Sequence, residues 1–293
     1  MENKKTKDKI TWKKFFIWFL IIIVLLGVSI VYVQPSLFFY PWHDAKSYEA
    51  LKNIDSFEEI TIQNDKETIH GWIRYENIEE KENKKPLIIM FGGNAQNSSN
   101  TCMWFEEDAI FDRFTGYNFL IIDYPEYGLS TGRVSEKTLF STGIKAYEYS
   151  ESLSCVDKEN IIVMGFSIGT GVATYVSSEK QPNGLILVAP YDEAINLYNN
   201  TLNIFHGPIK LLTLYKLESI KYAAKVETKP LIVTSTGDEV ISYKLSENLS
   251  KNFKNSSEYM CVEGTNHNTY FLREDVLTKI EEYLKGKLEI ENN

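Results

Sequence analysis

The sequence predicts an α/β protein in which eight strands form a mainly parallel sheet, with one membrane helix before it. Two observations predict the sheet: short, continuous apolar runs, as in strands buried on both faces, and helical patterns that alternate with these runs. Parallel strands need crossover connections, so this alternation indicates a single domain of about 240 residues with helices flanking the sheet. The 293 residues are 43% hydrophobic, which is enough for one large core.

The first two strands form a predicted hairpin, residues 57–62 and 68–75, around the turn sequence QNDKE. The remaining apolar runs predict six further strands at 86–91, 117–122, 160–165, 184–189, 230–235 and 257–262. Helical patterns lie between and after them at 99–114, 135–150, 168–178, 242–252 and 270–285. These elements define a predicted domain over residues 56–290.

The N-terminal region contains a segment without charge at residues 15–33. Nineteen helical residues span roughly 28 Å, close to the hydrocarbon thickness of a bilayer. Trp18 and Tyr32 lie near its two ends, where aromatic side chains favour the membrane interface. No polar stripe interrupts the segment, as it would in a helix on the surface of a domain. We therefore predict a transmembrane anchor at 15–33 and a tether at 34–55.

Charge predicts the orientation of this anchor. Residues 1–14 form a basic segment with six lysines, whereas only Lys46 and Lys52 follow the anchor closely. The positive-inside rule then places the N-terminus in the cytoplasm and the catalytic domain outside the cell, tethered to the cell membrane. A cleaved signal peptide is the alternative, although the apolar segment is longer than such peptides have and SIVYVQPS is a poor cleavage site.

The interval between Ala189 and Pro230 is longer than one crossover helix requires. It is rich in aromatic residues, and Gly207-Pro208 interrupts it near the middle. Insertions after the carboxyl end of a strand often cover an active site, so residues 191–225 are a predicted lid. The alternative is additional helical scaffold.

Ser167 lies at the junction between a predicted strand and a predicted helix, in the sequence Gly-Phe-Ser-Ile-Gly. A nucleophile on such a tight turn needs small residues two positions before and after it, and Gly165 and Gly169 meet that requirement. The helix that follows directs its first N–H groups toward any oxyanion formed nearby. The position predicts a nucleophile elbow.

A serine at its ordinary pKa needs a base, and in this architecture the acid and then the histidine follow the serine. Only His206 and His267 follow Ser167, and His206 lies within the predicted lid. His267 comes after the last strand, so it is the predicted base. Asp238 is the first carboxylate after the strand at 230–235 and is the predicted acid, with Glu239 as the neighbour to exclude.

The oxyanion needs two convergent N–H donors. The residue after the nucleophile, Ile168, is one predicted donor. The loop after the strand at 86–91 reads FGGNAQN, and its glycines allow the backbone to approach the site closely. The backbone N–H of Asn94 is therefore the second predicted donor. The alternative for this loop is a plain Gly-Asn turn.

Five stretches, in this order, resemble the α/β-hydrolase superfamily: FGGNA, DYPEYGLSTG, GFSIGTGVA, TGDEVI and EGTNHN. More narrowly, they resemble bacterial members of its membrane-anchored serine hydrolase branch, which includes lysophospholipases, monoacylglycerol-type lipases and depalmitoylases. The resemblance implies a lipase-type or carboxylesterase-type serine hydrolase with Ser167, Asp238 and His267 as its triad. It has two departures: the family usually has His-Gly-Asn where this chain has Gly92-Gly93-Asn94, and Arg-Gly where it has Pro125-Glu126.

These observations predict an enzyme that cleaves carboxylic ester or thioester bonds of lipid or acyl-chain substrates. The chemistry needs no metal or cofactor, and the net charge of -9 argues against nucleic acid as a partner. A serine peptidase of the same fold is the near alternative, and an inactive membrane-tethered binding protein is the alternative from another class. Deleting residues 1–34 is then expected to leave the hydrolysis of short soluble esters nearly intact and to depress the turnover of membrane-embedded substrates.

Overall fold

A computed structural model describes residues 2–201 and 203–289 of the chain, with side chains described for residues 12–200 and 203–288. One eight-stranded sheet runs through the domain in the order β1-β2-β4-β3-β5-β6-β7-β8. The strands are β1 (Phe57–Asn64), β2 (Glu67–Arg74), β3 (Lys85–Phe91), β4 (Asn118–Ile122), β5 (Val156–Phe166), β6 (Gly184–Val188), β7 (Leu231–Ser235) and β8 (Glu258–Val262). The predicted fold class is confirmed, including the number of strands.

The sheet is antiparallel only at its first edge. β1 pairs with β2 and β2 with β4 in antiparallel register, whereas every pair from β4-β3 to β7-β8 is parallel. The five residues of β4, β6 and β7 are all buried, as their continuous apolar sequences predict. All of the parallel strands end at one edge of the sheet, where the loops that carry Asn94, Ser167, Asp238 and His267 follow them.

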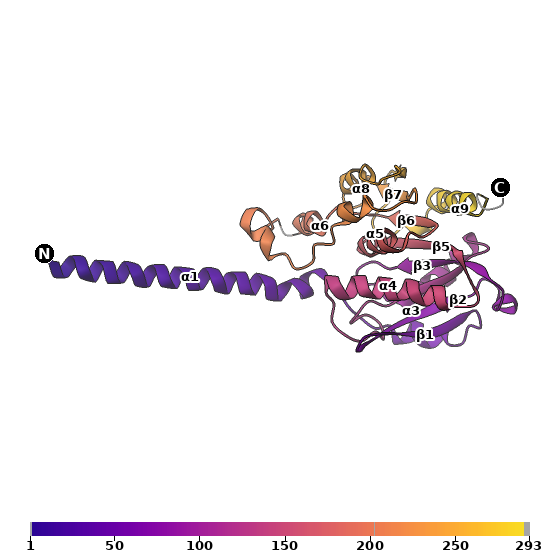
Figure 1. The fold of residues 1–293 in the computed structure, drawn as a ribbon, viewed down its shortest axis with the longest axis horizontal. Helices are drawn as coiled ribbons and strands as arrows, with labels where there is room; N and C mark the ends of the chain where they lie inside the picture. Colours follow the sequence, from indigo (N-terminus) through magenta and orange to yellow (C-terminus); the bar gives the residue numbers. More distant parts are fainter. Residues whose placement is uncertain (1, 202, 290–293) are drawn as a thin grey trace.

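Helices cover both faces of the sheet (Figure 1). Alternate residues of β3 divide between two cores: Leu87 and Ile89 face α4 and α5, and Ile88 and Met90 face α3 and α9. The helices of the domain are α2 (Ala45–Leu51), α3 (Ser98–Glu107), α4 (Glu136–Ser152), α5 (Gly169–Lys180), α8 (Tyr243–Ser250) and α9 (Glu274–Glu289).

Two predicted helical segments each divide into a short 3-10 helix and an α-helix. The pattern over 99–114 divides into α3 and the 3-10 turn η2 (Phe111–Arg113), because Ala109 adopts a left-handed conformation with φ 53°. The pattern over 270–285 divides into η4 (Tyr270–Leu272) and α9, because Arg273 is extended between them. The irregular stretch that remains before η4 carries His267.

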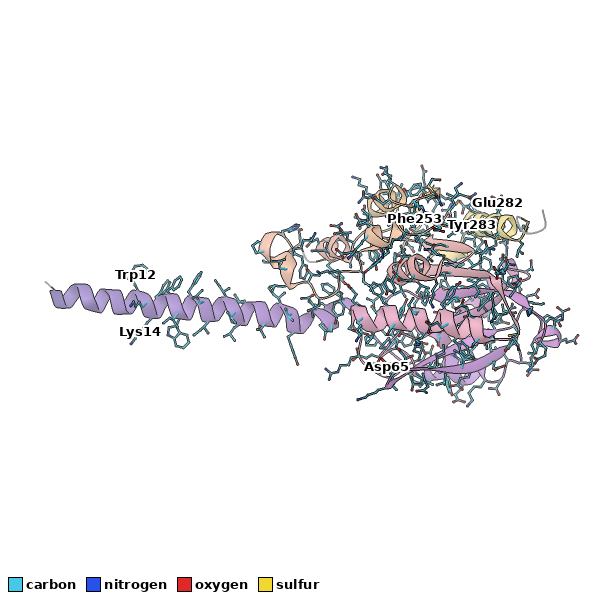
Figure 2. All side chains as sticks on the ribbon, in the orientation of Figure 1. Trp12, Lys14, Asp65, Phe253, Glu282 and Tyr283 are labelled. Carbon is cyan, nitrogen blue, oxygen red and sulfur yellow. The ribbon has the colours of Figure 1, made fainter. Side chains whose placement is uncertain are left out.

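The N-terminal helix α1 (Glu2–Phe38) projects from the domain (Figure 1). Its apolar part, Trp12–Phe38, is long enough to cross a membrane and is exposed along its most apolar stretch, so it is a candidate membrane span by length and composition. Figure 2 shows Trp12 and Lys14 on the projecting part of α1, away from the domain. The helix is longer than the predicted segment of residues 15–33.

The chain after the predicted anchor is packed, which differs from the expected tether at 34–55. Helix α1 continues to Phe38, and the side chains of Gln34, Phe38 and Phe39 are buried. The two phenylalanines join the core on the α4/α5 side of the sheet, because apolar side chains of this size are more stable out of water. The domain therefore begins at the end of α1 rather than at residue 56.

The segment predicted as a lid contains three short helices, α6 (Ala194–Thr201), η3 (Gly207–Leu212) and α7 (Ser219–Ala223). Four of its aromatic side chains are buried against the domain: Tyr191, Tyr198, Phe205 and Tyr215. Several of its aliphatic side chains are exposed: Ile204, Ile209, Leu211 and Leu214. In Figure 1 the segment lies beside the end of α1 that adjoins the domain.

Candidate active site

Ser167 lies on a sharp turn between β5 and α5. Its φ is 53°, a left-handed conformation that is uncommon for a residue with a side chain. A Cβ at Gly165 would approach the carbonyl oxygen of Gly169 to 2.7 Å, and a Cβ at Gly169 would lie 2.1 Å from the carbonyl oxygen of Phe91. The turn therefore has no room for a side chain at either position, as the Gly-x-Ser-x-Gly pattern predicts.

The structure brings Ser167, His267 and Asp238 together. Nε2 of His267 lies 2.8 Å from Oγ of Ser167, and Nδ1 lies 2.9 Å from Oδ2 of Asp238. An ionised carboxylate only accepts hydrogen bonds, so Nδ1 carries the proton and donates it to Asp238. The unprotonated Nε2 then accepts the hydroxyl hydrogen of Ser167, the arrangement in which imidazole acts as a general base.

Asp238 is held in its ionised form. Its side chain is fully buried, and this burial raises the pKa of the carboxyl. The hydrogen bond and charge of His267, together with the backbone N–H groups of Ile241 and Val240, have the opposite effect and leave the pKa below its ordinary value. Asp238 is therefore a carboxylate that accepts a hydrogen bond from Nδ1 of His267, which is the contact expected of the predicted acid.

Two residues that the sequence analysis did not single out support this geometry. Tyr270 is fully buried, and its hydroxyl donates a 2.9 Å hydrogen bond to Oδ2 of Asp238. Oγ of Ser235 donates to the carbonyl oxygen of Thr265 and accepts from the backbone N–H groups of Gly237 and Thr265. Ser235 thus joins the loop of the acid to the loop of the base. The only sequence signal was their position next to the predicted triad residues.

The reacting groups are shielded from water. Ser167 and His267 are 6% and 7% exposed, and the ring of Phe166 stacks on the imidazole of His267 with ring centroids 5.1 Å apart. Electrostatic interactions are stronger in such a site than in bulk water.

Glu239, the neighbour of the predicted acid, does not bind the imidazole of His267. Its Oε2 accepts a hydrogen bond from the backbone N–H of His267 instead.

Two backbone donors near the nucleophile have no internal acceptor. Among the residues that the structure describes, the N–H groups of Asn94 and Ile168 form no hydrogen bond, whereas the Gly93 N–H binds Oε1 of Gln96. The loop packs tightly against the elbow, since a Cβ at Gly93 would lie 2.9 Å from the ring of Phe166. Both predicted donors are therefore available to an oxyanion.

His206 and His70 form their hydrogen bonds away from Ser167. His206 is exposed and contacts Oδ1 of Asn203. His70 is buried on β2, with Nδ1 2.7 Å from Oδ2 of Asp123 and Nε2 3.2 Å from Oε1 of Glu59. Within residues 2–201 and 203–289, no cluster of three or more His, Cys, Asp or Glu side chains is arranged to hold a metal ion.

Solved structures share this fold. An esterase of Pyrococcus furiosus superposes with a TM-score of 0.65 at 13% identity, covering 86% of this chain and 98% of the esterase. The esterase Est1E of Butyrivibrio proteoclasticus superposes with a TM-score of 0.62 at 17% identity, covering 79% of this chain and 99% of Est1E.

Relatives are also found by sequence, although no protein-family model matches the chain. The human α/β-hydrolase domain-containing protein 17C is 28% identical over 201 residues, 69% of this chain and 58% of the human protein. An uncharacterized protein of Mycobacterium tuberculosis is 28% identical over 183 residues, 62% of this chain and 63% of the mycobacterial one. The match thus spans less than two thirds of either relative. The chain thus shares the fold of these esterases and is similar in sequence to α/β-hydrolase domain-containing proteins.

Proposed function

We propose that the chain is a membrane-anchored serine hydrolase that cleaves carboxylic ester or thioester bonds through an acyl-enzyme. The observation that carries this proposal is the continuous hydrogen-bonded path from Ser167 through His267 to Asp238. The esterases with the same fold agree with it. The proposed active site needs no cofactor.

In the first step Oγ of Ser167 attacks the substrate carbonyl carbon while Nε2 of His267 takes the hydroxyl proton. The negative charge moves to the carbonyl oxygen, where the N–H groups of Asn94 and Ile168 stabilise it. The intermediate then collapses, and the leaving alcohol or thiol departs with the proton from His267. Water attacks the acyl-enzyme with the same base, which releases the carboxylic acid and restores Ser167.

A lipid or acyl-chain substrate fits the surroundings of this site. The candidate membrane helix is joined directly to the domain, and the segment over 191–225 presents exposed aliphatic side chains beside it. With the lysines of residues 1–14 in the cytoplasm, the domain lies outside the cell and within reach of the outer lipid surface.

A fluorophosphonate probe tests the proposal, because it labels only an activated serine. Wild-type protein and His206→Ala should be labelled, whereas Ser167→Ala and His267→Ala should lose labelling and ester hydrolysis, with kcat reduced on the order of 10⁶-fold. Activity of Ser167→Ala above about a tenth of the wild-type value would place the nucleophile elsewhere. An unlabelled wild-type protein would instead indicate a binding protein.

Comparison of substrates separates the remaining alternative. Esters and thioesters of increasing acyl length should be cleaved faster than peptides, because a domain joined to a membrane helix meets acyl chains at the lipid surface. Preferential cleavage of peptides would identify a serine peptidase of this fold.

A further inference from the structure

Gln34 is a fully buried polar residue near the C-terminal end of α1, where it follows the apolar stretch of that helix. Its side-chain amide donates a 2.8 Å hydrogen bond to the carbonyl oxygen of Leu212 and accepts one of 2.9 Å from the N–H of Leu214. Both partners belong to the lid, about 180 residues later in the chain. The amide therefore satisfies two main-chain groups of the lid that have no regular secondary structure to pair with.

The next turn of α1 extends this contact through aromatic side chains. The ring of Phe38 stacks on Tyr198 of α6 with centroids 3.6 Å apart, and the ring of Phe39 meets Tyr215 edge-on at 4.7 Å. All four of these side chains are buried. In the sequence of the lid, one of these aromatic contacts precedes the residues that bind Gln34 and the other follows them.

The same helix end also holds the loop of the proposed oxyanion donor. Nδ2 of Asn94 donates to the carbonyl oxygen of Phe38 at 2.9 Å, and Oδ1 accepts from the N–H of Tyr40 at 3.1 Å. The next residue of this loop, Ala95, accepts a hydrogen bond at its carbonyl oxygen from the indole N–H of Trp42. The side chain of Asn94 therefore contacts the end of α1, while its backbone N–H stays available to the active site.

We propose that the end of α1 is a bracket for the active site, in which Gln34 is the residue that positions the lid. The bracket consists of Gln34, Phe38, Phe39 and Tyr40. It fixes the lid on one side and the Asn94 loop on the other. On this proposal the membrane helix also positions parts of the active site. It holds the lid in place, and an acyl chain reaches Ser167 beneath that lid.

The position of the lid along α1 determines whether its exposed side chains meet water or lipid. A Cβ at Gly27 would lie 3.9 Å from Cδ1 of Leu212, so η3 runs beside the apolar part of α1 rather than beyond its end. Leu211 is 86% exposed and Leu214 is 47% exposed. With α1 in a bilayer, these side chains lie at the depth of the lipid and are covered by it.

The effect of the bracket on catalysis rests on the proposed function, whereas its effect on the lid does not. The first measurement therefore follows the lid alone. Full-length protein in vesicles of phosphatidylcholine and phosphatidylglycerol is compared as wild type, Gln34→Met and Ser29→Ala. Methionine keeps the length of the side chain and removes both hydrogen bonds to the lid, together with a 3.3 Å hydrogen bond to the carbonyl oxygen of Ile30 within α1. Ser29 is the matched control, because its exposed hydroxyl bonds only to the carbonyl oxygen of Leu25 within α1.

Hydrogen–deuterium exchange over residues 203–217 should be about tenfold faster in Gln34→Met than in wild type, with β5 unchanged as a monitor of folding. Exchange in Ser29→Ala should equal that of wild type. Unchanged exchange in Gln34→Met would overturn the bracket, and so would equal acceleration in both variants. This readout stands even if wild-type protein hydrolyses no ester.

Catalysis supplies the second readout. In Gln34→Met, kcat/KM for a long-chain acyl ester should fall about tenfold, mainly through KM, while fluorophosphonate labelling of Ser167 persists. Deleting residues 1–34 should also slow the hydrolysis of soluble short esters, contrary to the behaviour of a passive tether. Wild-type kinetics on both substrates after either change would overturn the positioning role.

A second variant guards against a folding defect in α1. Leu214→Pro removes the N–H that Gln34 accepts and leaves α1 unaltered. Thr213 before it already has the extended backbone that proline requires, with ψ 120°. The lid should exchange faster in this variant too, and wild-type exchange would contradict the role of Gln34.

Discussion

The hydroxyl of Tyr270 and the carboxylate of Asp238 lie 2.9 Å apart in a fully buried pair, with the tyrosine as donor. Tyr270→Phe removes this donor and changes little else, because the ring keeps its volume. A hydrogen bond to a charged group contributes about 1.5–3 kcal/mol, so we expect kcat to fall by roughly tenfold.

The pH dependence of the same variant distinguishes positioning from a general loss of stability. Without the Tyr270 donor the charged form of Asp238 is less stabilised, so the pKa of that carboxyl rises. The acid limb of the kcat profile should then move to higher pH, whereas a loss of stability alone, measured by urea unfolding, would leave that limb in place. An unshifted profile with a large loss of stability would show that Tyr270 only fills the core.

Asp238→Asn should reduce kcat on the order of 10⁴-fold, because an asparagine amide favours the wrong tautomer of His267. Glu239→Gln should be mild, since glutamine keeps an oxygen that accepts the His267 N–H. Steady-state kinetics of the two variants decide the assignment of the acid. A crippled Glu239→Gln variant would move the acid by one position.

Stability against pH provides a further check on Asp238. Its pKa is lowered in the folded protein, so its ionisation stabilises the fold above the unfolded pKa, and this contribution is lost as pH falls through the folded pKa. Asp238→Asn lacks this contribution. Its free energy of unfolding should therefore differ most from that of wild type near neutral pH and converge with it below about pH 4, as urea titrations will show.

Gly169→Ala should disable the enzyme without removing any reacting group. The added Cβ would lie 2.1 Å from the carbonyl oxygen of Phe91 and 2.5 Å from that of Gly92, so the Asn94 loop must move away from Ser167. We expect a loss of about 1–3 kcal/mol in stability and a lower kcat. Gly286→Ala is the matched control, because no heavy atom lies near that Cβ and alanine favours the helix. Equal thermal midpoints for both variants would contradict the steric account.

The proposed orientation predicts that an external protease removes the domain from intact cells. Lysines before the apolar segment favour the cytoplasmic side, which leaves residues after α1 accessible from outside. Immunoblotting for the C-terminal region should show its loss, while a cytoplasmic marker persists. If cleavage requires lysis, the domain faces the cytoplasm and the substrate is on that side.

The sheet and the proposed triad could be predicted because their signals are local. Each buried strand is a short apolar run, and Ser167, Asp238 and His267 directly follow three of these runs. Once the strands are assigned, parallel pairing brings their carboxyl ends to one edge and so gathers the loops.

The supporting contacts could not be predicted, because they join residues far apart in the chain. Nothing near His70 in the sequence indicates its contacts with Asp123 and Glu59. Removal of this buried side chain should be destabilising, because it leaves the buried carboxylate of Asp123 without that partner. Gln34 follows the predicted anchor directly, so the sequence places it at a boundary, and only the packed lid shows why it is buried.

The order of strands in one half of the sheet has a consequence for biosynthesis. β5, β6, β7 and β8 lie side by side in the order in which they are made. A chain that emerges N-terminus first can add each of these strands to an edge that is already formed. His267 follows the last of them, so the nascent protein acquires its proposed base at the end of its assembly. On the proposed function, a nascent chain that lacks β8 and the loop after it has no complete triad and therefore hydrolyses no ester.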